Sequence, residues 1–315
     1  MNNPNPHFPV DILLNNSLQL FENLCDRYQL QYNFEKGLSK RLKIICTDDY
    51  IDDSAKIEEH FNEDDNKYYQ ISVWDNYCQF LWIICYSSMV FMDELIIKPI
   101  LQPTVKQNEE LLETTFDMFK AGMSLFNRDS TQRANRSVFF EFPNPVNNKG
   151  DETIESANRL FEGALCFNLF HEYSHIDLGH PEKEYLKDDE LAADYSGFYS
   201  MYENLSLEKK KYLSLSIIIA LGTLLFRDNT LSGETHPDPD DRLGRLLDKM
   251  EDLDNQGKEY CYCLAVTLYK MWAYHYDLES IIPKIDKANF YKEYFSLIQE
   301  AFSNYKILGV PNSNN

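Results

Sequence analysis

Two histidines and a glutamate stand at a spacing that binds zinc in many hydrolases. His171 and His175 are four residues apart in the sequence HEYSH, which puts both imidazoles on one face of a helix, one turn apart. Two such nitrogens can reach one Zn²⁺ at about 2.0–2.1 Å. Glu172 lies beside them, angled so that its carboxylate can take a proton from metal-bound water without binding the metal. The segment predicts a zinc-activated water.

Zinc that activates water needs a third protein ligand and a free fourth position, and four residues downstream of the motif are candidates. Asp177 is excluded while the chain is helical, because two residues past His175 is about 200° around the helix. His180 does not continue the HExxHxxGxxH spacing, in which glycine stands at 178 and histidine at 181. The remaining candidates, Glu190 and Asp194, begin a second helix after a short turn.

Glu190 and Asp194 stand four residues apart in ELAAD, so they share one face of that helix. Taken alone, such a pair is more typical of a solvated acidic helix start. The HEYSH motif upstream favours a functional interpretation, in which Glu190 binds the zinc. Asp194 then accepts the outer N–H of a ligand histidine and fixes the orientation of its ring.

The segment HPDPDDR at 236–242 is a rigid turn that leads into a helix, and it allows two interpretations. In one, it is an ordinary helix start with acidic residues in the first turn and an ion pair of Arg242. In the other, the turn presents His236, supported by Arg242, to the negative oxygen that forms when a peptide carbonyl is attacked. The sequence favours neither.

The other histidines have no clear chemical role in the sequence. His180 can line the cleft, but a surface position after the helix end is the stronger expectation. His7, His60 and His275 have no partners at useful spacing, and we expect them to be structural. The sequence also lacks a serine or cysteine nucleophile arrangement and a glycine-rich phosphate loop.

Hydrophobic periodicity predicts helices at about 12–30, 77–97, 153–178 and 188–202. The second should be mostly buried and end at Pro99 and Pro103. The third carries HEYSH near its end, and apolar residues at helical spacing anchor it in a core. The best strand candidate is SVFFEF at 137–142. We expect the acidic segment 48–66 to be a solvated loop or helix face.

These elements predict a mainly α fold of the α+β class, with a zincin-like catalytic core and a short sheet beside the metal-binding helix. A chain of 315 residues can hold one large domain or two modest ones. We predict a mainly helical N-terminal region at 1–130 and a zincin-like catalytic domain at 131–315, with one continuous globule as the alternative.

Composition limits the partners and the compartment. The formal net charge is −21, so the surface repels phosphate backbones and a nucleic-acid partner is not expected. The seven cysteines form no C-x-x-C pair, which favours a reducing, cytoplasmic compartment, and the N-terminus lacks a secretory signal. The apolar run 212–226 is shorter than the roughly 20 residues that span a bilayer, so we expect a buried core helix and no membrane partner.

HEYSH followed by ELAAD resembles the gluzincin pattern of zinc metallopeptidases. FHEYSHIDLGH, DDELAADYSGFY and THPDPDDRL together resemble the phage-exclusion peptidase family typified by the Lit protein, over about residues 135–250. The resemblance implies a cytoplasmic peptidase that cleaves elongation factor Tu during phage infection.

The sequence therefore predicts a zinc-dependent endopeptidase that hydrolyses a peptide bond in an intracellular protein. Its metal ligands would be His171, His175 and Glu190, with Glu172 as general base. Two alternatives stay open: a non-catalytic acidic interaction protein that keeps a zincin scaffold, and a regulatory peptidase that cleaves a repressor.

Overall fold

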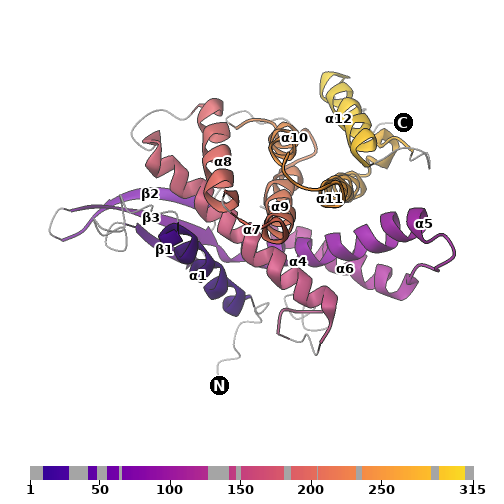
Figure 1. The fold of residues 1–315 in the computed structure, drawn as a ribbon, viewed down its shortest axis with the longest axis horizontal. Helices are drawn as coiled ribbons and strands as arrows, with labels where there is room; N and C mark the ends of the chain where they lie inside the picture. Colours follow the sequence, from indigo (N-terminus) through magenta and orange to yellow (C-terminus); the bar gives the residue numbers. More distant parts are fainter. Residues whose placement is uncertain are drawn as a thin grey trace.

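Helices make up most of the chain, and a three-stranded sheet lies at one side (Figure 1). The computed structural model describes residues 10–27, 42–47, 55–63, 66–126, 142–146, 150–180, 186–203, 205–231, 236–284 and 291–308. The predicted mainly α fold of the α+β class is confirmed. The strand predicted at 137–142 lies outside the described residues, except that Phe142 is part of a bend.

The sheet consists of β1 (Leu42–Thr47), β2 (Ala55–Phe61) and β3 (Lys67–Trp74) in the order β1-β3-β2. The central strand β3 is parallel to β1 and antiparallel to β2. Its sequence KYYQISVW is rich in the aromatic and β-branched residues that favour a pleated, half-buried surface. Both β2 and β3 contact α7, so the sheet lies beside the helix that carries HEYSH, although it comes from the N-terminal region that we expected to be mainly helical.

The expectation of a solvated loop or helix face for the acidic segment 48–66 is wrong for 55–61, which forms β2. Successive side chains of a strand point to opposite faces of the sheet. Its carboxylates are balanced by lysines: Glu58 lies 2.8 Å from Lys56, and Glu59 lies 2.7 Å from Lys67 on β3. The number of carboxylates in the segment did not reveal this strand.

Strand β3 leads directly into α4 (Asp75–Phe91), which continues as the π-helix η1 (Met92–Ile97) and α5 (Lys98–Leu101). Most of α4 is buried, as predicted. The helical stretch runs past Pro99, because this proline lies in the first turn of α5, where no backbone N–H is needed. Residues 75–97 are long and apolar enough to cross a membrane, but 78% of the most apolar window is buried inside the protein, as in a core helix.

The long helix α7 (Glu152–Asp177) runs through the middle of the molecule (Figure 1). It begins at Asp151, whose side chain accepts hydrogen bonds from the backbone N–H groups of Thr153 and Ile154. It contacts α1 (Asp11–Arg27), α4, α8 (Lys187–Tyr202) and α9 (Leu207–Gly222). The other helices of the described residues are α6 (Glu109–Phe126), η5 (Thr223–Arg227), α10 (Pro239–Lys249), α11 (Asn255–His275), η6 (Glu279–Ile281) and α12 (Tyr291–Leu308).

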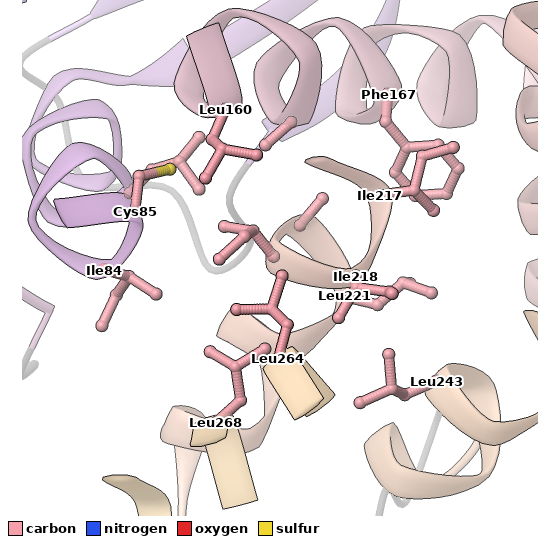
Figure 2. Close-up of a cluster of buried hydrophobic side chains, with 14 of the residues drawn as sticks. Ile84, Cys85, Leu160, Phe167, Ile217, Ile218, Leu221, Leu243, Leu264 and Leu268 are labelled. Carbon is pink, nitrogen blue, oxygen red and sulfur yellow. The ribbon is translucent and has the colours of Figure 1, made fainter. Parts of the chain in front are cut away.

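The run 212–226 forms most of α9 and η5, and its apolar side chains are largely buried, as expected of a core helix. Figure 2 shows where they meet the other helices. Labelled side chains come from α4, α7, α9, α10 and α11: Ile84, Cys85, Leu160, Phe167, Ile217, Ile218, Leu221, Leu243, Leu264 and Leu268. They belong to one hydrophobic cluster with members from Val10 to Tyr305. The division of the chain near residue 130 stays a prediction.

Candidate metal centre

The last turns of α7 and the first turn of α8 bring together the three residues predicted to bind metal. His171 Nε2 lies 3.2 Å from His175 Nε2. Glu190 spans both rings, with Oε2 3.4 Å from His171 Nε2 and Oε1 3.4 Å from His175 Nε2. The ligand atoms of a tetrahedral zinc with bonds of about 2.0–2.1 Å stand roughly 3.3–3.4 Å apart. The spacing and chemistry of these three side chains therefore fit a metal ion.

The close packing of α8 on α7 depends on a glycine at the crossing point. Gly197 lies against the backbone of α7, and an added Cβ there would stand 3.2 Å from the backbone nitrogen of His171. The first turn of α8 is acidic, which suits the positive end of the helix dipole. The close approach at Gly197 brings the carboxylates of α8 near the histidines of α7.

Asp194 lies behind His171 and pairs with Arg242, which also lines the cavity in front of the site. Asp194 Oδ1 is 3.0 Å from His171 Nδ1, the ring nitrogen turned away from Glu190. Arg242 on α10 donates from Nε and Nη2 to the two oxygens of Asp194, each at 2.7 Å, and its Nη1 lies 3.5 Å from Glu190 Oε2. Both Asp194 and Arg242 are buried. The guanidinium is therefore engaged with the carboxylates that hold the site.

His180 is not on the surface, so the expected surface position is wrong. Gly179 follows the end of α7 with a φ of +72°, and this left-handed residue turns the chain so that the next side chain is buried. His180 Nδ1 lies 2.8 Å from His175 Nδ1, and its Nε2 lies 3.3 Å from Asp189 Oδ1. The sequence analysis did not predict that His180 contacts His175 or that Asp189 contacts His180. The only signal was that these residues stand close to His175 and Glu190 in the sequence.

The charges around the site favour a cation between the two histidines. Burial lowers the pKa of His171, but hydrogen bonds to Asp194 and Glu190 outweigh it and raise that pKa to about 10. Burial and the neighbouring His171 lower the pKa of His175 to about 3. Burial opposes ionisation of Glu190, yet its contact with His171 holds the pKa of this carboxyl well below its usual range. A divalent ion supplies the positive charge that these carboxylates favour.

Burial also opposes ionisation of Asp194, and the Arg242 guanidinium is the main reason that its pKa is nevertheless lowered. The group thus contains two carboxylates, a guanidinium and two imidazoles in a largely buried place. A buried charge is tolerated only when it is paired and hydrogen-bonded, and both carboxylates lie against the guanidinium of Arg242.

A cavity of about 280 Å³ opens in front of the site. Glu172 lines it from α7, and His236 lines it from the turn before α10, with Nε2 3.8 Å from Glu190 Oε1. The side chain of His236 is 33% exposed, so it is accessible from the cavity. Part of β2 also lines it, through Ala55, Lys56 and Ile57. Asp177 is exposed at the end of α7 and is not among the residues that line this cavity.

The structure therefore brings every predicted site residue to one cavity or directly behind it, and adds His180 and Asp189. The comparisons with known proteins agree with a hydrolytic site. Residues 71–265 match the family model of Peptidase U49, the Lit-type peptidase family. Neither the curated proteins nor the solved structures contain a match. The matched residues are more than half of the chain and include both metal-site helices and the His236 turn, and the chain therefore belongs to the Peptidase U49 family.

Proposed function

We propose that this peptidase is a zinc-dependent endopeptidase that uses the centre formed by His171, His175 and Glu190. The observation that carries the proposal is the set of three nitrogen and oxygen separations, 3.2, 3.4 and 3.4 Å, which match a tetrahedral zinc site. Two imidazoles and one glutamate are also a known ligand set of catalytic zinc, which leaves one position for water. Zinc held by these three residues would supply a Lewis acid and would lower the pKa of a water molecule to about 7.

Glu172 is the residue that moves the proton in this proposal. It directly follows His171 on α7, lies at the cavity wall and is partly exposed. A carboxylate in this position can accept a proton from the attacking water and later give it to the departing amine. Such proton transfer contributes about 10²–10⁴-fold to rates.

His236 and Arg242 have different parts. His236 is exposed to the cavity from a turn stiffened by Pro237 and Pro239, so its ring can donate a hydrogen bond to the developing oxyanion. Arg242 is buried against Asp194 and Glu190. We therefore assign Arg242 to holding these two carboxylates in position, and His236 to the oxyanion.

The substrate of this proposal is an extended segment of an intracellular protein. The edge strand β2 lines the cavity, and among the described residues only β3 pairs with it. A peptide in extended form can add to such an edge through backbone hydrogen bonds, with little demand on its side chains. Resemblance to the Lit-type family adds elongation factor Tu as a candidate substrate and phage defence in the cytoplasm as a candidate role.

The test compares the wild type with Glu172→Gln, using Glu155→Gln on the same helix as the matched control. Purified wild-type protein should contain one zinc per chain, and cells that express it should contain new protein N-termini. Glu172→Gln should keep the zinc and the melting temperature while cleavage falls by about 10²–10⁴-fold, and Glu155→Gln should resemble the wild type.

Each result has a distinct meaning. Cleaved elongation factor Tu supports the phage-defence role, and a cleaved transcriptional repressor supports the regulatory alternative. A wild-type protein that binds no zinc, or a Glu172→Gln variant with unchanged cleavage, would overturn the proposed mechanism. Zinc binding without any cleaved protein favours an interaction protein on the same scaffold.

A further inference from the structure

The two ligand histidines are supported in different ways on the sides turned away from Glu190. His171 Nδ1 faces the carboxylate of Asp194 directly, at 3.0 Å. His175 Nδ1 faces another imidazole, with His180 Nδ1 at 2.8 Å. The far nitrogen of that second ring, His180 Nε2, lies 3.3 Å from Asp189 Oδ1. His175, His180 and Asp189 are all buried.

We propose that Asp189 and His180 form a relay that fixes the tautomer and the ring orientation of His175. This inference rests on the proposed metal site, because it explains how the lone pair of His175 Nε2 is kept available for the metal. Both His180 and Asp189 act through His175 and are positioning residues.

The tautomers of His180 and His175 can be inferred by starting from Asp189. An ionised carboxylate only accepts hydrogen bonds, so Asp189 Oδ1 selects the form of His180 that carries its proton on Nε2. A neutral imidazole carries one proton, so His180 Nδ1 is then bare and accepts from His175 Nδ1–H. His175 Nε2 is left bare in turn, facing His171 and Glu190. A bare ring nitrogen is the form that binds a metal.

Asp189 is itself held in place by the start of α8. Its second oxygen, Oδ2, accepts the backbone N–H of Leu186 at 3.1 Å, which caps the helix. Glu190, the third ligand, is the next residue along the same helix. One helix start therefore supplies a ligand to the metal and, through His180, positions another ligand on α7. Loss of the contact between His175 and His180, or of the contact between His180 and Asp189, should weaken metal binding without removing a ligand.

The experiment replaces His180 by leucine and by glutamine, with His275→Leu on α11 as the matched control for loss of a histidine away from the site. Leucine offers no acceptor to His175 Nδ1, whereas the carbonyl of glutamine can accept. We expect His180→Leu to weaken zinc binding by about 10–100-fold, as losses of partners behind metal ligands do. His180→Gln should recover part of this loss, and His275→Leu should bind zinc like the wild type. Affinities come from competition with a chelator.

A second readout needs no metal and no activity. Ring ¹⁵N NMR of the metal-free wild type should report His175 with a protonated Nδ1 and a bare Nε2, and His180→Leu should shift the ring toward the other tautomer. Asp189→Asn retains only one acceptor oxygen for two donors, so it should weaken zinc binding as well.

Wild-type zinc affinity and an unchanged His175 tautomer in His180→Leu would overturn the relay. If His180→Leu fails to fold, His180→Gln and Asp189→Asn decide the question by the same two measurements. A wild type without zinc affinity defeats the proposed function, while the NMR result still supports or overturns the relay.

Discussion

The middle and the end of α7 are both buried but are held by different forces. In the middle, Leu160 and Phe167 pack among apolar side chains of α4, α9 and α11 (Figure 2). At the end, His171 and His175 lie among carboxylates, a guanidinium and a third imidazole. Apolar burial stabilises in any direction and needs only a close fit. The polar end requires a partner for each charge, because an isolated buried charge costs several kcal/mol.

The difference shows which part of α7 requires particular side chains and which part requires only a close apolar fit. Apolar contacts along α7 hold the helices together, and one side chain of similar volume can replace another at modest cost. The polar end depends on α8, on α10 and on His180, which follows Gly179, and these approach from separate parts of the chain. Four predictions test this contrast, from the largest expected change to the smallest.

Arg242→Met should lower the free energy of unfolding of the metal-free protein by about 3–5 kcal/mol, because it removes the partner of a buried carboxylate, Asp194. Urea denaturation measures the change. Arg245→Met, on the exposed face of the same helix, is the control and should have little effect. Saturating zinc should recover part of the loss, since a divalent ion binds the folded state and restores positive charge. A loss below 1 kcal/mol would mean that Asp194 is not dependent on this pairing.

Leu160→Ala tests the apolar half of the contrast. Leu160 is 3% exposed, and truncation of such a side chain leaves a cavity, so we expect a loss of about 2–5 kcal/mol in urea denaturation. Zinc affinity should stay at the wild-type level, because the metal end of α7 lies about three turns away. The exposed neighbour Arg159→Ala is the control. A matching fall in zinc affinity would refute the separation of the two halves.

Gly197→Ala acts where the two halves meet. An added Cβ would crowd the α7 backbone at His171, and overpacking costs about 1–3 kcal/mol. The better helix propensity of alanine offsets about 1 kcal/mol, so a net loss of at most about 2 kcal/mol is expected. Zinc affinity should also fall, because Glu190 and Asp194 move with α8.

The control is Gly257→Ala, whose added Cβ meets only side chains, the nearest being Asp254 at 3.1 Å. Unchanged affinity in Gly197→Ala would contradict the proposed helix spacing.

Glu59→Gln should have the smallest effect. Its ion pair with Lys67 joins β2 to β3, but both side chains are about one-third exposed. Water screens such a pair, so the loss should be below about 1 kcal/mol in urea denaturation. A loss as large as that of Arg242→Met would show that burial is not what separates the two kinds of ion pair.

Features that depend on the spacing of residues a few turns apart could be predicted from the sequence. The helices around HEYSH and ELAAD, and the convergence of His171, His175, Glu190 and Asp194, follow from the 3.6-residue period of a helix and a short turn. The buried helix at 212–226 follows from its length and polar content. These features depend on neighbours within a few turns, so no knowledge of distant contacts was needed.

Long-range packing decided the remainder. The pairing of Arg242 with Asp194, 48 residues away in sequence, depended on how α10 packs against α8. The buried place of His180 depended on a single left-handed glycine and on Asp189 across the turn. Residues 55–61 of the acidic segment form an edge strand because their backbone pairs with β3 along its length, and lysines on β2 and β3 lie against two of its carboxylates. Such pairings cannot be predicted from the order of residues. A charged side chain or an imidazole can be solvated by water or paired with a buried partner, and only the tertiary structure decides which.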